Sequence, residues 1–180
     1  LSLLEDIGQQ DLTADLIPKN AIAKARLISR QDAVLCGQDW FNEVFKQLDP
    51  SIQIHWFFND ADLLRENAVV CELSGNARAL LSGERTAMNF LQTFSGTATH
   101  TKLYADIIKD LPVKLLDTRK TLPGLRLGQK YAVRCGGGVN HRFGLYDAIL
   151  IKENHILAAG SIAAAVAQAK ALHPNVSIEV

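Results

Sequence analysis

The sequence predicts an α/β protein whose second half begins either a barrel or a doubly wound sheet of parallel strands. Residues 148–151 and 176–180 are short apolar runs without alternation, which is typical of strands buried on both faces. Between them, residues 161–173 carry apolar side chains at helical spacing, and Pro174 ends that helix. A strand, a helix and a strand at this spacing form a βαβ unit, whose strands run parallel. The apolar run at 113–116 is expected to be a further strand of the same sheet.

The first 111 residues mix strands and helices and are expected to form one domain, with residues 112–180 as the second. The elements expected in the first domain are, in order, a strand-like segment (25–37), an amphipathic helix (39–48), an alternating strand (51–58), an apolar run (68–73) and a long helix (82–111). Glu84 and Arg85 are expected to open the long helix, where Glu suits the helix dipole and Arg does not. We therefore expect Arg85 to have another partner, with a surface salt bridge as the alternative. Small residues at 95–99 predict close packing of another backbone segment.

Composition narrows the classes of function. Formal charge is zero, from 19 Lys and Arg against 19 Asp and Glu, so no general attraction to nucleic acid or to a membrane is expected. No apolar run approaches the roughly 20 residues that cross a bilayer. Cys36, Cys71 and Cys135 are scattered, which indicates free thiols in a reducing compartment and predicts a cytoplasmic protein. The five histidines lack zinc spacing, so no metal site is assigned to the side chains of this chain.

Both ends of the chain are expected to be cut. Residues 1–6 have the pattern of the middle of an amphipathic helix, and residues 176–180 have the pattern of a strand. The sequence is therefore interpreted as a fragment of a longer protein.

Charged side chains follow each of the three expected strands of the second half. Residues 117–121 follow the first strand, residues 152–155 follow the second, and Glu179 lies in the third. Ligands of parallel α/β folds bind at the carboxyl ends of the strands, so these positions predict a binding site. The alternative is that charges only mark where each strand leaves the core.

A run of three glycines, residues 136–138, ends a helix that is expected to start after Pro123. Three glycines are more than a helix cap needs, and they allow close approach to a ligand or to another strand. A flexible surface loop is the alternative. His141 and Arg142 follow, and the planar guanidinium of Arg can hold a carboxylate through two parallel hydrogen bonds. His141 is a candidate donor or proton carrier, although a lone His is more often structural.

Several blocks of sequence occur in a characteristic order: DTRKT (117–121), PGLR (123–126), KYAV (130–133), GGGVNHR (136–142) and LIKENH (150–155). Upstream of them lie EDIG (5–8) with Asp11 and Thr13, and ERTAMNF (84–90) followed by Ser95 and Gly96. Together these blocks closely resemble the quinolinate phosphoribosyltransferase family, also called nicotinate-nucleotide pyrophosphorylase (carboxylating). Gln10 stands where this family often has Gly. Several long blocks in fixed order over nearly the whole chain are far more specific than any single motif.

The resemblance implies an N-terminal α/β sandwich-like domain (1–111) that includes the long linking helix, followed by the first strands of an irregular α/β barrel (112–180), truncated. It also implies a reaction, in which quinolinate and phosphoribosyl pyrophosphate give nicotinate mononucleotide, pyrophosphate and CO2 in de novo NAD biosynthesis. The cofactor implied is Mg2+, with ligands expected mainly from the pyrophosphate of the donor and from residues after Val180.

Residue roles follow from the same resemblance. Arg119, His141, Arg142 and Lys152 would hold the two carboxylates of quinolinate, and Arg85 would reach the neighbouring site of a homodimer. The residues implied in catalysis are Lys120, which would face the phosphoribosyl donor, Lys152 and Glu179. Burying several negative charges without partners would cost several kcal/mol per ion, so such a site needs cations. The protein is then expected to position and neutralise its substrates, without a covalent intermediate.

Two other functions remain open at this point. One is a phosphoribosyltransferase of the same fold that uses a monocarboxylate such as nicotinate, although four cations favour a dicarboxylate. The other is a non-catalytic anion-binding module, which would bind carboxylates or phosphates without ribosyl transfer. Competition binding and a turnover assay separate these functions.

Overall fold

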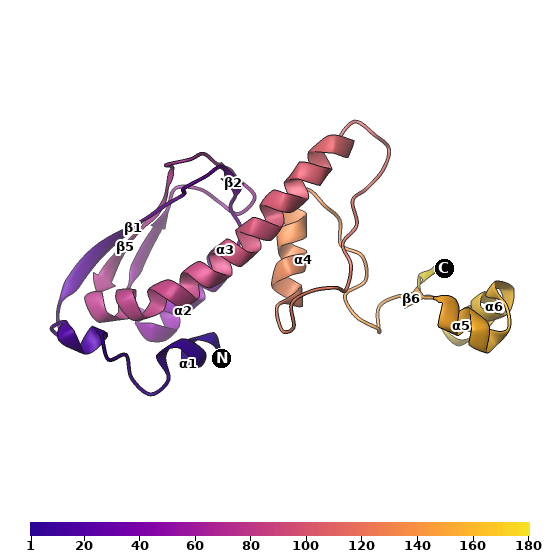
Figure 1. The fold of residues 1–180 in the computed structure, drawn as a ribbon, viewed down its shortest axis with the longest axis horizontal. Coiled ribbons are helices and arrows are strands. Elements are labelled where there is room, and N and C mark those ends of the chain that lie inside the picture. Colours follow the sequence, from indigo (N-terminus) through magenta and orange to yellow (C-terminus); the bar gives the residue numbers. More distant parts are fainter.

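A computed structural model describes all residues, 1–180, and it is a mixed α/β structure, as predicted (Figure 1). The first half of the chain contains, in order, α1 (Ser2–Ile7), a 3-10 turn (Ala14–Leu16), β1 (Ile22–Ile28), β2 (Ala33–Val34), α2 (Gln38–Leu48), β3 (Gln53–Trp56), β4 (Leu63–Leu64), β5 (Val69–Asn76) and α3 (Ala77–Ile108). The second half contains α4 (Arg126–Cys135), β6 (Ile149–Leu150), α5 (Glu153–Ala159), α6 (Ile162–Leu172) and β7 (Ile178–Glu179).

The N-terminal layer is a three-stranded antiparallel sheet in the order β1-β5-β3, with α2 and α3 on one face. The alternation predicted for 51–58 is confirmed, because Ile52, Ile54 and Trp56 are buried or half-buried while Gln53 and His55 are exposed. The opposite face of the sheet is polar and therefore suited to solvent, with the side chains of Lys24, Arg26, Gln53, His55, Glu72 and Ser74.

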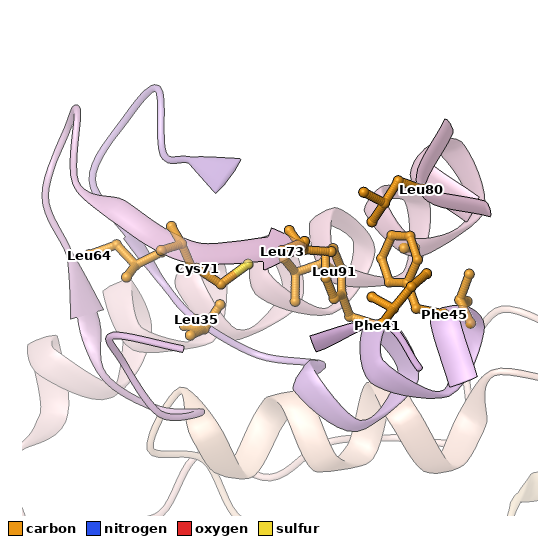
Figure 2. Close-up of a cluster of buried hydrophobic side chains, with 12 residues drawn as sticks. Leu35, Phe41, Phe45, Leu64, Cys71, Leu73, Leu80 and Leu91 are labelled. Atoms are coloured by element: carbon orange, nitrogen blue, oxygen red, sulfur yellow. The ribbon is translucent and has the colours of Figure 1, made fainter. Parts of the chain in front are cut away.

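The main core lies between this sheet and the two helices. Figure 2 shows Phe41 and Phe45 of α2 in one cluster with Leu80 and Leu91 of α3 and with Leu73 of β5. All five side chains are at most 6% exposed. Burying an aliphatic or Phe side chain contributes about 1.5–3 kcal/mol, so this cluster is the chief stabilising element of the first half.

The long helix begins earlier than the sequence predicts. Asn76, the last residue of β5, caps α3 by accepting hydrogen bonds from the backbone N–H groups of Arg78 (3.0 Å) and Ala79 (3.2 Å). Glu84 and Arg85 therefore lie two turns inside the helix, and the prediction that they open it is wrong. Ala77, Leu80 and Gly83 extend the buried face of α3 toward its N-terminus, so the capping residue Asn76 is what marks the start of the helix.

The small residues of α3 receive the backbone of β2, as predicted. The Ser95 hydroxyl accepts from Cys36 N (2.9 Å) and donates to Cys36 O (3.1 Å), while Thr99 Oγ1 accepts from Val34 N (2.8 Å). Ala98 between them is fully buried. Side-chain hydroxyls of α3 thus satisfy backbone polar groups of Val34 in β2 and of Cys36, which follows this strand, where the helix buries them.

Helix α4 packs on α3 through glycine and alanine. A Cβ on Gly128 would lie 2.3 Å from the ring of Phe94, and Ala132, one turn later, is fully buried against the same cluster. The predicted start after Pro123 and the end at the glycine run are confirmed. Because the approach is this close, α4 is fixed relative to α3.

Each glycine of the 136–138 run has a structural reason. A Cβ on Gly136 would lie 2.3 Å from the carbonyl oxygen of Ala98, Gly137 has a φ of +89°, and a Cβ on Gly138 would lie 2.6 Å from Val133. The close approach that the glycines allow is therefore to α3 and to α4 itself, within the protein, and the alternative of a flexible surface loop is wrong.

A polar cluster joins α4 to the first half of the chain. Asp60 accepts hydrogen bonds from Tyr131 Oη (3.0 Å) and from Gly37 N (3.0 Å). Beside Tyr131, a hydrogen bond from the Cys36 thiol lowers the pKa of Cys135 to about 7, although burial opposes this shift. The same hydrogen bond, together with burial, raises the pKa of Cys36.

The βαβ prediction for 148–180 is confirmed, since β6 and β7 pair in parallel with α6 between them. The expected burial of both strands on two faces is wrong, because Ile149 and Leu150 are only half-buried and Glu179 is exposed. Ser161 caps α6 through Ala164 N (3.1 Å), and an additional helix, α5, precedes it. In Figure 1 this unit lies at the end of the molecule away from the N-terminal sheet. No single helix is long and apolar enough to cross a membrane; α5 and α6 meet that criterion only as a pair bent by 89°.

The prediction of a regular strand at 113–116 is wrong. Only Leu116 makes a β-bridge, parallel to Val139. Val113 and Leu116 are 55% and 50% exposed, so burial on both faces is also wrong for this run. The physical reason is that a single bridge supplies neither neighbouring strands nor a covering layer.

Gly128→Ala should destabilise the chain by about 1–3 kcal/mol, because the new methyl group forces the buried Phe94 ring to move. Gly96→Ala is the matched control, since a Cβ there meets nothing within 4 Å. Alanine at this helical position should stabilise by about 0.5–1 kcal/mol. Chemical denaturation measures both changes, and equal effects of the two substitutions would contradict the packing described.

Cys135 should be the first thiol to be alkylated by iodoacetamide, with a rate that reaches half its plateau near pH 7. Below that pH the thiol is protonated and unreactive. Cys71, whose pKa is raised to about 12 by burial, and the fully buried Cys36 should react only on unfolding. Peptide mass spectrometry after timed labelling reads out each site.

Cys36→Ala is the control for that prediction. It removes the thiol that donates to Cys135, so the half-maximal rate should move to a higher pH. An unchanged profile would show that this hydrogen bond does not set the reactivity of Cys135.

Candidate functional site

The candidate site begins where the segments around Leu116 and Val139 run side by side. Val139 N donates to Leu115 O (2.8 Å), and Asp117 N donates to Val139 O (3.1 Å). This parallel pairing brings the DTRKT and GGGVNHR blocks together, although about 20 residues separate them in sequence. Each segment ends with residues that were predicted to bind anions.

A buried ion pair lies directly beneath this junction. Lys130 Nζ lies 2.5 Å from Asp117 Oδ1, and the two side chains are only 1% and 7% exposed. Asn140 Nδ2 donates to the other carboxylate oxygen of Asp117 (2.6 Å) and to Lys130 O (2.8 Å). Both charges are therefore neutralised and hydrogen-bonded, as burial of ions requires.

His141 and Glu179 are brought together across 38 residues of sequence. The Nε2 atom of His141 lies 2.7 Å from Glu179 Oε2. The His141 side chain is 26% exposed and that of Glu179 is 57% exposed, so the pair borders solvent. This contact connects the glycine-run segment to the end of β7, as expected if strand ends share one edge of a sheet.

Arg142 lies next to this pair and closes the loop that leads to β6. Its Nη1 donates to Ala148 O (3.3 Å), which leaves most of its donors unused within the chain. In the same loop, Asp147 accepts from Phe143 N (2.6 Å) and Gly144 N (3.0 Å). These backbone hydrogen bonds lower the pKa of Asp147 and hold the loop compact.

Arg119 carries a buried donor without an acceptor. Its Nε is inaccessible to solvent and has no hydrogen-bond partner in the chain. A buried, unpaired N–H costs free energy, and it is among the first groups to be satisfied by a bound anion. Lys120 follows on the exposed surface, with its backbone N–H bound to Thr118 Oγ1 (3.0 Å).

Lys152 stands at the N-terminus of α5, immediately after the strand β6 and Ile151. Its backbone N–H donates to Nδ1 of His155 (2.9 Å), and its side chain is free and exposed. The predicted placement after a strand is confirmed for this residue.

Arg85 lies apart from the other predicted site residues. It is exposed on α3, nine residues before Phe94, which places it about 14 Å along the helix axis from the α4 contact. Arg85 forms no salt bridge within the chain, so the surface salt bridge considered as the alternative is wrong here.

Sequence reasoning named DTRKT and KYAV but gave Asp117, Lys130 and Asn140 no role. One signal was available in the helical period of α4. Gly128 and Ala132 share one face, and Lys130 projects from the opposite face, where a buried lysine needs an acidic partner. Which acid supplies that charge depends on the tertiary fold.

A cavity beside α3 lies away from the candidate site. A cavity of about 710 Å3 between the β1–β2 loop and the middle of α3 is lined by 17 residues, none of which is a predicted site residue. The candidate site is instead an open edge, formed by segment ends and bordered by solvent.

Two family models match the chain in succession. The model described as "Quinolinate phosphoribosyl transferase, N-terminal domain" matches residues 11–95, and the model described as its C-terminal domain matches residues 97–180. The probable nicotinate-nucleotide pyrophosphorylase (carboxylating) of Bacillus subtilis is 46% identical over 178 residues, which are 98% of this chain and 62% of that relative.

Solved structures agree with these matches. The nicotinate-nucleotide pyrophosphorylase from Francisella tularensis is similar with a TM-score of 0.95 at 55% identity, over 99% of this chain and 64% of that chain. The enzyme of the same name from Ehrlichia chaffeensis has a TM-score of 0.92 at 35% identity, over 99% and 66%. The chain thus spans about 62% of the length of the curated relative from Bacillus subtilis.

Proposed function

The chain belongs to the quinolinate phosphoribosyltransferase family, and from this premise we propose the activity of the whole protein. It transfers the phosphoribosyl group of phosphoribosyl pyrophosphate to quinolinate and releases pyrophosphate and CO2, giving nicotinate mononucleotide for NAD biosynthesis. This makes it a pentosyltransferase, a carboxylating nicotinate-nucleotide diphosphorylase.

The observation that carries this proposal is the buried, unpaired Nε of Arg119 beside the strand ends that hold His141 and Arg142. The remaining guanidinium donors of Arg119 and Arg142 suit two carboxylates on a planar ring. Lys152, exposed and without a salt-bridge partner, supplies a further positive charge at the next strand end. A pyridine dicarboxylate matches this set in charge.

To hold a substrate carboxylate, His141 must donate a hydrogen bond from the one ring nitrogen that is left free. Because Glu179 occupies its Nε2, only Nδ1 is left for the substrate. A neutral imidazole that donates from Nε2 can only accept at Nδ1, so a hydrogen bond to a substrate carboxylate requires the imidazolium form. The Glu179 carboxylate stabilises that positive charge, which gives Glu179 its part in catalysis.

The reaction follows from charge and position. The ring nitrogen of quinolinate attacks C1 of the ribose, the C–O bond to pyrophosphate breaks, and the ring gains positive charge. CO2 then leaves, and the electron pair of the broken carbon–carboxylate bond stays on the ring carbon next to the positive nitrogen, which stabilises it. That carbon takes up a proton from water to give nicotinate mononucleotide. Lys120 is placed to meet the negative charge of the phosphoribosyl donor, and the other cations hold quinolinate in line.

Magnesium dependence is part of the proposal for the whole protein, although the residues of this chain do not form a protein-held magnesium site. Mg2+ requires oxygen ligands, commonly one or two carboxylates with substrate phosphates. The chain brings no group of three or more His, Cys, Asp or Glu together, and Glu179 is already paired with His141.

A homodimer is also proposed, in which Arg85 reaches the site of the neighbouring subunit. Its exposure, its lack of a salt bridge and its place on a long helix away from Arg119 support this role. The three free cysteines support a cytoplasmic location.

Quinolinate binding to the whole protein, measured by calorimetry, tests the function first. Arg142→Ala should weaken binding by roughly 10- to 100-fold, since a hydrogen bond to a charged group contributes about 1.5–3 kcal/mol. Nicotinate should bind much more weakly than quinolinate. Equal binding of nicotinate would favour a monocarboxylate substrate, and binding without turnover would favour an anion-binding module.

Mixing two inactive variants tests the shared site. Whole proteins carrying Arg85→Ala or Arg142→Ala should each lose activity, and subunit exchange should restore up to about a quarter of it, because half of the dimers then contain one intact site. Arg26→Ala, on the solvent-facing side of the sheet, serves as the control that keeps full activity. No recovery on mixing would show that Arg85 acts within its own subunit.

A further inference from the structure

We propose that the buried pair Asp117 and Lys130 positions the quinolinate site by holding the backbone of His141 from both sides. This inference rests on the proposed function and assigns the pair a role beyond it. Neither side chain is a substrate ligand in this arrangement. Both act through the residues that they hold.

The hydrogen bonds converge on one residue. His141 N donates to Asp117 Oδ1 (2.8 Å), and His141 O accepts from Lys130 Nζ (3.1 Å). The two partners are themselves joined at 2.5 Å, so the peptide groups on either side of the His141 Cα are bound to one rigid unit. Asn140, the preceding residue, is bound by the same unit through its side chain.

The pair is bonded within the protein and buried away from a ligand. Asp117 Oδ1 accepts from Lys130 and from His141, and Oδ2 accepts from Asn140 Nδ2. Lys130 Nζ also lies 4.9 Å from the centroid of the Phe143 ring, which covers it. With 1% and 7% exposure, neither side chain can reach a substrate at the solvent border.

The position of the pair is set by the packing of α4. Gly128 and Ala132 hold one face of this helix against Phe94, and Lys130 extends from the other face toward Asp117. Tyr131 adds a hydrogen bond to Asp60. Lys130 thus transmits the fixed position of α4 to the main chain of the site.

The proposed ligands continue directly from the atoms that the pair holds. Arg119 follows Asp117 by two residues, and Arg142 follows His141 by one. A buried ion pair is a poor source of stability, since well-packed apolar residues often serve as well or better. A requirement for accurate placement of charged donors explains why polar groups occupy this position.

The test is steady-state kinetics of the whole protein, with Lys130→Met as the first variant. The KM for quinolinate should rise about 10- to 100-fold, because a displacement of the order of 1 Å at the ligands suffices for such a change. The KM for phosphoribosyl pyrophosphate should stay within about twofold, since none of the hydrogen bonds or the salt bridge of the pair involves Lys120. Leu127→Ala is the matched control on the same helix, and it should leave both KM values unchanged because the Leu127 side chain is 71% exposed.

The double variant Asp117→Asn/Lys130→Met separates positioning from stability. It leaves no unpaired charge buried, so it should recover most of the melting temperature lost in Lys130→Met. It should keep the raised KM for quinolinate, because His141 O still lacks its donor. If the KM returns with the melting temperature, the pair acts only on stability and the inference is wrong.

Calorimetry keeps this inference distinct from the proposed function. Wild-type protein that fails to bind quinolinate would overturn the function itself. Wild-type and double-variant proteins that bind quinolinate equally would overturn only the positioning role. Tight binding by the wild type with at least about tenfold weaker binding by the folded double variant is the result we expect.

Discussion

Phe94 fills the junction between α3 and α4, and its ring leaves no room for a side chain at Gly128. Because interiors are close-packed, this contact determines how near the two helices lie and at which rotation α4 presents its opposite face. That face carries Lys130, and Lys130 holds the segments of the candidate site. The charged edge of the second half therefore depends on the hydrophobic core of the first half, because the ring of Phe94 places α4 and α4 places Lys130.

The electrostatics of the molecule are local. A chain of zero formal charge has no long-range attraction for an anion, yet its second half separates two kinds of cation. Lys130 is fully paired and buried, and serves the structure of the site. Arg119, Arg142 and Lys152 keep unused donors, and they are available to a ligand. Lys130 is neutralised inside the protein and holds the backbone in place. The other three cations keep their charge free, and together they form a cationic edge.

Two parallel backbone pairings meet at this edge. The parallel bridge between Leu116 and Val139 aligns the first two segments, and the parallel pair β6–β7 aligns the others. The contact between His141 and Glu179 connects these two sets. Since parallel alignment places carboxyl ends together, residues from four separate segments can address one ligand without any of them being close in sequence.

Local periodicity in the sequence was sufficient to predict the helix at 39–48, the alternating strand at 51–58 and the βαβ unit at 148–180, because those patterns depend on neighbours within a few residues. The order of the motifs was sufficient to identify the family and the candidate cations. The start of α3 at Ala77 also has a local signal, because the preceding Asn76 is a residue that favours helix N-caps. The single bridge at Leu116 and the buried partners of Lys130 were decided only by the tertiary structure. Each of these depends on a neighbouring segment or an opposite charge supplied by a distant part of the chain, and one-dimensional spacing carries no information about which distant groups meet.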